Sequence, residues 1–125
     1  MRFLLLIQNP AGHRQPEPDA GLGAALAGLI DELADAGALI DTAGLRPPEE
    51  GVRVRLSGGA LTVRDGPYTE AKEVVGGYCL LRAASYDEAT AWAKRFLGVH
   101  RGGDTGGGDT ADWDMTVEVR RLDEG

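Results

Sequence analysis

The sequence predicts an α+β fold, a ferredoxin-like split βαβ sandwich with an inserted β-hairpin. Three observations predict it. Apolar stretches of strand length alternate with two stretches of helical periodicity, a Gly-Gly dipeptide divides an alternating segment, and 125 residues suffice for one core. We therefore expect a single domain over residues 1–125, with four main strands in an antiparallel sheet and both helices on one face.

The first half of the chain predicts a strand, a helix and a second strand. Residues 3–7 form a continuous apolar run of strand length, and three prolines and a glycine then indicate a long loop. Apolar residues recur at helical spacing from residue 20 onward, after Asp19 as the N-cap and before Gly37 as a stop. The segment ALIDTAGLRPP follows as a short strand that ends in a proline pair, which cannot continue a ladder.

The segment VRVRLSGGALTVRD predicts a hairpin that turns at Gly58 and Gly59. With a two-residue turn, Leu56 faces Leu61 and the strand pairing continues outward to Val52 opposite Asp65. One face is then apolar and the other carries arginines. Asp65 is expected on the apolar face.

The second half predicts a strand, a helix and a final strand. Residues 77–83 are apolar enough for a strand buried on both faces, and Ser85 with Glu88 has the spacing of a capping box. An apolar stripe at helical spacing follows: Ala89, Trp92, Ala93, Phe96 and Leu97. The glycine-rich segment that includes residues 102–108 lacks periodicity and is expected to act as a lid before a strand at 115–122.

Two helices cover only one face of such a sheet. The other face exposes an apolar surface unless a second copy packs upon it, so the fold predicts a homodimer whose sheets enclose a partly hydrophobic interior.

Composition disfavours several classes of partner. The formal net charge is −7 and no run of Lys or Arg occurs, so we expect neither nucleic-acid nor membrane-surface binding. The apolar N-terminal run is too short to span a membrane and lacks a cleavage site, which predicts a cytoplasmic protein. Cys79, the single cysteine, is expected in the core, and two histidines do not provide a His-rich metal site. We expect no cofactor.

The stretch DGPYTEAKEVVGGY resembles the DGPF signature of the YCII-related proteins. The matching residues are Asp65, Gly66, Pro67, Glu70, Lys72, Glu73, Gly76, Gly77 and Tyr78. Tyr68 departs from the usual phenylalanine, and the glycine-rich segment is longer than expected. The resemblance implies a dimeric α+β barrel, a fold shared with small lyases and isomerases of aromatic degradation and with members of no known activity. Because some members are encoded beside alternative sigma factors, it also implies a bacterial protein with a regulatory or stress-linked role.

Asp65 and His13 are the candidate catalytic residues. Apolar neighbours would desolvate the Asp65 carboxylate and suit it to acid–base chemistry, although Asp-Gly-Pro is also a strong turn sequence in which the side chain simply binds the backbone. His13 lies in the long loop after the first strand, in a position like that of a loop histidine near the cleft of YCII-related proteins. A neutral imidazole near Asp65 would be a base with an orienting acid, whereas an exposed loop position is the alternative.

The candidate ligand-binding residues are Tyr68, Glu70, Lys72, Glu73 and Arg46. Glu70 and Glu73 could form a carboxylate pair beside Lys72, able to hold a proton or a divalent cation, or all three could be a solvated cluster. Tyr68 could stack on an aromatic ligand or fill the core. Arg46 could bind a carboxylate or only solubilise the surface.

The sequence predicts a small homodimeric protein that binds a ligand in a cleft lined by the DGPY motif. The alternative is a lyase or isomerase that uses Asp65 or His13 for proton transfer on an unsaturated or aromatic carboxylate. A purely structural dimer is the third possibility, should side chains fill the interior.

Overall fold

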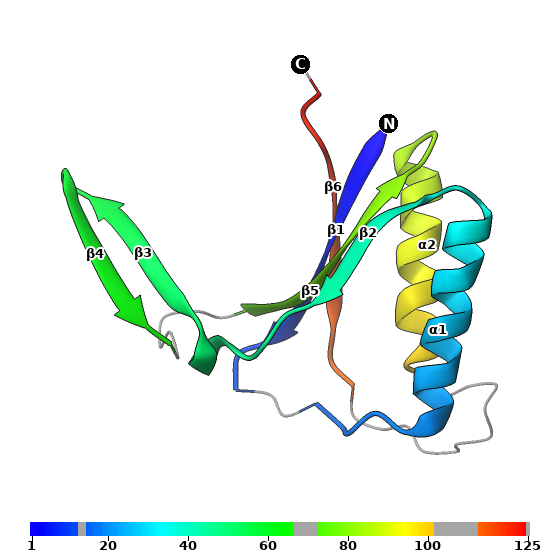
Figure 1. Cartoon of the computed structure of the whole chain (residues 1–125), viewed down its shortest axis with the longest axis horizontal. Coiled ribbons are helices and arrows are strands. Elements are labelled where there is room, and N and C mark those ends of the chain that lie inside the picture. Colours follow the sequence, from blue (N-terminus) through cyan, green and yellow to red (C-terminus); the bar gives the residue numbers. More distant parts are fainter. Residues whose placement is uncertain (13–14, 67–72, 102–112, 125) are drawn as a thin grey trace.

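The structure is a computed structural model that describes residues 1–12, 15–66, 73–101 and 113–124 (Figure 1). The elements in chain order are β1 (Arg2–Pro10), α1 (Ala20–Asp35), β2 (Leu39–Gly44), the short 3-10 helix η1 (Pro48–Glu50), β3 (Val52–Ser57), β4 (Ala60–Asp65), β5 (Glu73–Arg82), α2 (Tyr86–Val99) and β6 (Thr116–Arg121).

The main sheet has four strands in the order β2-β5-β1-β6, and each neighbouring pair is antiparallel. Figure 1 shows α1 and α2 side by side on the same face of this sheet. β3 and β4 form a separate two-stranded sheet, inserted between β2 and β5. The predicted α+β class is confirmed, and the strand order is compatible with the ferredoxin-like split βαβ arrangement.

Both helices begin at the predicted caps. Oδ1 of Asp19 accepts the backbone N–H of Leu22 at 2.7 Å, and Oγ of Ser85 accepts that of Glu88 at 3.2 Å. The Glu88 carboxylate in turn accepts the N–H of Ala84 at 2.9 Å, which completes a variant of the capping box. Within the described ranges, neither helix is long and apolar enough to cross a membrane.

The hydrophobic core lies between the helices and the inner face of the sheet. Phe3 and Leu81, which face each other across β1 and β5, are fully buried. Cys79 is buried as predicted. The other buried members of this core are Leu5, Leu29, Leu33, Ala38, Ala83, Ala89 and Ala93.

The outer face of the sheet is open, and this corrects the prediction for β5. The strand was expected to be buried on both faces, but Tyr78 and Leu80 are only partly buried. Leu4 and Leu6 of β1 lie opposite them and are also partly buried. The physical reason is that both helices pack on the inner face, so no described element covers the outer one.

The hairpin β3-β4 has the predicted register. Gly58 and Gly59 have φ of 58° and 79°, the left-handed values of a primed turn, and Val52 lies opposite Asp65. Figure 1 shows the hairpin standing away from the main sheet. Its apolar face is therefore solvent-exposed: Val54 is 64% exposed and Leu61 is 73% exposed.

Candidate functional site

Gly66, the residue after β4, is anchored at the base of the hairpin. The N–H of Gly66 donates to the carbonyl of Gly51 at 3.0 Å. A Cβ at Gly66 would lie 1.7 Å from the carbonyl oxygen of Pro48, so no other residue fits without moving η1. These contacts of Gly66 therefore fix where β4 ends.

Asp65 lies on the apolar face of the hairpin, as the register predicted, but that face is not covered. The residue is exposed, and its neighbours on the same face, Val52 and Val63, are 58% and 69% exposed. The expected desolvation of Asp65 is therefore absent in the single chain. The reason is the position of the hairpin, which projects from the body instead of folding against it (Figure 1).

Arg46 is already engaged by a carboxylate of its own chain. Its guanidinium contacts Glu50 through two nitrogens, Nη2 to Oε2 at 2.8 Å and Nε to Oε1 at 3.3 Å. Both side chains are exposed, so water screens this pair and it contributes little stability. The pair lies across η1, next to the hairpin base.

Glu73 is exposed and begins β5 opposite Pro10, the last residue of β1. Four segments thus lie together at one end of the sheet, as Figure 1 shows: the end of β4, η1, the start of β5 and the end of β1. The other predicted site residues, His13, Tyr68, Glu70 and Lys72, lie outside the described residues, as does the glycine-rich segment expected to act as a lid.

A buried carboxamide oxygen lies close to this end of the sheet. Oδ1 of Asn9 is buried, and no hydrogen-bond donor of the described chain reaches it. Asn9 follows a bulge in which Gly76 is the extra residue, because Ile7 pairs with Gly77 and Gln8 with Val75. A Cβ at Gly76 would lie 3.0 Å from Nδ2 of Asn9, so the glycine gives the carboxamide its room.

Tyr78, the last residue of the motif, forms a polar pair on the open face of the sheet. Its hydroxyl donates to Oδ2 of Asp41 on β2 at 2.8 Å, and this bond raises the pKa of Tyr78. Sequence reasoning did not single out Asp41, because only the strand register places it beside residue 78. Among described residues, no three His, Cys, Asp or Glu side chains gather as a metal site requires.

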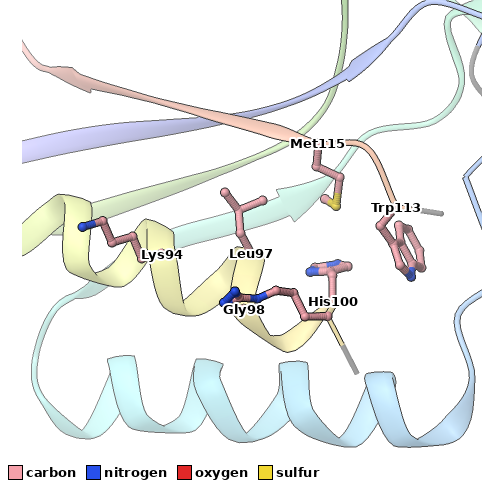
Figure 2. Close-up of a pocket in the computed structure, with 7 residues that line it drawn as sticks. Lys94, Leu97, Gly98, His100, Trp113 and Met115 are labelled. Carbon is pink, nitrogen blue, oxygen red and sulfur yellow. The ribbon is translucent and has the colours of Figure 1, made fainter. Parts of the chain in front are cut away.

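A separate open cleft of about 630 Å³ lies between the C-terminal half of α2 and the segment before β6 (Figure 2). Its described walls are Lys94, Leu97, Gly98, His100, Arg101, Trp113 and Met115. Figure 2 shows His100, Met115 and Trp113 gathered at one end, with Lys94 further along α2. We refer to this space as the α2 cleft.

His100 is held in place at the end of the α2 cleft. Its Nδ1 donates to the carbonyl of Phe96 at 2.9 Å, which leaves Nε2 as the other polar atom of the ring. The ring lies 4.9 Å from that of Phe96 and 5.0 Å, edge to face, from that of Trp113. Burial lowers the pKa of His100, so the imidazole is neutral near pH 7.

Comparison with known proteins places the chain in a family. Residues 1–102 match the model of the YCII-related domain. An uncharacterized protein of Rhizobium meliloti (strain 1021) is 36% identical over 69 residues, which is 55% of this chain and 56% of the relative, so the match spans about half of each. A crystal structure of an amidase of the hydantoinase/carbamoylase family from Burkholderia phymatum aligns at 22% identity with a TM-score of 0.24, over 99% of this chain and 28% of the amidase. The family match covers most of the sequence, and the chain belongs to the YCII-related domain family.

Proposed function

We propose that this protein works as a cytoplasmic homodimer that binds a small ligand beside the DGPY segment, in a regulatory or stress-linked role. The observation that carries the proposal is the solvent-exposed apolar face of the hairpin. Its members are Val52, Val54, Leu56, Leu61 and Val63, all more than half exposed. A contiguous apolar face of this kind on a projecting hairpin is typical of a protein–protein contact.

The proposed occupant of this face is a second copy of the chain. Five side chains are far fewer than the roughly 20–30 residues that each partner contributes to a stable interface. The open face of the main sheet offers further apolar surface, including Leu4 and Leu80. In a two-fold dimer each copy presents both surfaces, so one symmetric contact can bury hairpin and sheet together.

Dimerisation would also change the surroundings of Asp65. The carboxylate shares its face with Val54 and Val63, so a partner that covers these valines also removes water from Asp65. A carboxyl group with little water around it binds ligands through strong hydrogen bonds. The buried Oδ1 of Asn9, which has no donor among the described residues, adds an acceptor for a ligand donor. Asn9 lies opposite Val74 of β5, in the C-terminal part of the DGPYTEAKEVVGGY stretch.

The alternative proposal is an enzyme, a small lyase or isomerase acting on an unsaturated or aromatic carboxylate. The observation that favours it is the same position of Asp65, on a hairpin face that a partner would cover, because a carboxyl group from which water is removed is suited to acid–base chemistry. Asp65 or His13 would then abstract the proton, with Tyr68 beside the substrate.

Thermal unfolding across a panel of small carboxylates and divalent cations tests ligand binding. We expect at least one compound to raise the Tm of the wild type and to leave the Tm of Asp65→Asn unchanged. Asp31→Asn, which alters an exposed acid on α1, is the control and should respond like the wild type. A compound recovered unaltered after incubation supports the binding role, and a converted compound supports the enzyme. If no compound raises the Tm of the wild type, the ligand proposal fails.

A further inference from the structure

We propose that the α2 cleft is a second binding site, for a small organic anion in which a carboxylate is carried on a flat apolar body. The proposal rests on the charges, the aromatic wall and the hydrogen bonding of the cleft. It is independent of the site proposed at the DGPY segment.

The described walls of the cleft carry a charge opposite to that of the whole chain. The protein has a formal charge of −7, yet Lys94 and Arg101 contribute two positive charges to the cleft and its described walls include no carboxylate. Neither cation forms an ion pair with a carboxylate of the residues described here. A local surplus of positive charge in an acidic protein concentrates small anions at that point.

The wall opposite α2 supplies a flat apolar surface. Trp113 and Met115 lie across the cleft from Leu97, and Trp113 meets the ring of His100 edge to face at 5.0 Å (Figure 2). Lys94 and His100 are six residues apart on α2, a rise of about 9 Å along the helix. This length accommodates one aromatic ring with a carboxylate at its end.

The end of the helix repels such an anion less than an uncapped end would, because three of its last four carbonyl groups accept hydrogen bonds. The C-terminus of a helix carries partial negative charge on its last carbonyls. Here the Phe96 carbonyl accepts a hydrogen bond from Nδ1 of His100, and the Leu97 carbonyl accepts one from the backbone N–H of His100. The Gly98 carbonyl accepts one from the backbone N–H of Arg101. An anion in the cleft therefore meets cationic and aromatic side chains in preference to free carbonyl oxygens.

Fluorescence of Trp113 provides the test. Trp92→Phe removes the other tryptophan, and this single-tryptophan protein is titrated with benzoate, with the neutral amide benzamide and with inorganic phosphate at constant ionic strength. We expect a saturable change with benzoate and at least tenfold weaker binding of benzamide and of phosphate. Equal binding of benzamide overturns the role of charge, and equal binding of phosphate overturns the role of the flat body.

Two variants locate the binding. Gly98 lines the cleft and a Cβ there meets nothing within 4 Å, so Gly98→Leu places a bulky side chain at the cleft wall. Gly28→Leu on α1 is the matched control, because a Cβ at Gly28 also meets nothing within 4 Å. We expect Gly98→Leu to abolish the benzoate response and Gly28→Leu to preserve it. The double variant Lys94→Gln, Arg101→Gln should weaken the binding of benzoate about tenfold, because it removes both positive charges of the described cleft walls. Arg82→Gln, at the far end of β5, should leave the affinity for benzoate unchanged.

The variant Asp65→Asn separates binding at the α2 cleft from binding at the proposed DGPY site. Asp65→Asn alters the DGPY site and should leave the benzoate titration as it is in the parent protein. If Asp65→Asn abolishes the response and Gly98→Leu does not, benzoate binds at the DGPY site and the α2 cleft is not a binding site. No response to benzoate in any variant also overturns the proposal.

Discussion

The hydroxyl of Tyr78 donates a 2.8 Å hydrogen bond to Oδ2 of Asp41, which ties the Gly-Gly-Tyr end of the motif to the edge strand β2. The other carboxylate oxygen, Oδ1, accepts the N–H of Thr42 at 2.8 Å, so the Asp41 side chain is fixed at both oxygens. The pair lies on the open face of the sheet, next to Leu6. It is therefore a polar contact within the surface that we propose for the dimer.

Removing the charge of Asp41 should make Tyr78 easier to ionise. The hydrogen bond to Asp41 raises the pKa of Tyr78, because the phenol must lose the proton that it donates. In Asp41→Asn we expect this pKa to fall towards 10, the ordinary value for tyrosine. NMR titration of the tyrosine ring carbons measures the change directly. An unchanged pKa in Asp41→Asn would show that the bond is not formed in solution.

Protonation of His100 should destabilise the fold. Burial lowers the pKa of His100 in the folded state, so the unfolded chain binds this proton at a higher pH. The unfolded state is then favoured as the pH falls through about 6.5. We expect the free energy of unfolding in urea to decrease between pH 7.5 and pH 5.5, and to decrease less in His100→Gln. Equal pH dependence in both proteins would contradict the burial of His100.

Adding one methyl group at Gly66 should loosen the hairpin while the core stays intact. In Gly66→Ala the new Cβ would lie 1.7 Å from the Pro48 carbonyl oxygen, so the N–H bond to Gly51 must break. We expect amide hydrogen exchange in β3 and β4 to accelerate about tenfold while β1 keeps its rates. Gly44→Ala, where the Cβ has open space, is the control. Unchanged exchange in the hairpin of Gly66→Ala would contradict its anchoring on η1.

Local signals predicted the elements of this fold well. The alternation of residues around Gly58 and Gly59 predicted the whole hairpin register correctly, out to the pair Val52 and Asp65. A two-residue turn leaves no other pairing of the two strands. Asp19 and Ser85 gave the helix starts for a similar reason, since a cap acts on an N–H only three residues away.

Features that depend on distant parts of the chain were not predictable. The exposure of Asp65 depends on the direction in which the hairpin leaves the sheet, and no alternation of residues encodes that direction. The bond between Tyr78 and Asp41 spans 37 positions and needs the strand order first. The α2 cleft was missed because His100 and Trp113 flank an aperiodic segment, so neither stands in a recognisable pattern.

The mass of the protein in solution shows whether the chain forms the proposed homodimer. At tens of micromolar, sedimentation equilibrium should give about twice the 13.2 kDa of one chain. Leu61→Glu, which places a charge on the apolar hairpin face, should give the mass of a monomer. Thr62→Glu, on the opposite face across from Arg55, should remain a dimer. A wild-type protein that sediments at 13.2 kDa, or a Leu61→Glu variant that stays dimeric, would contradict the account.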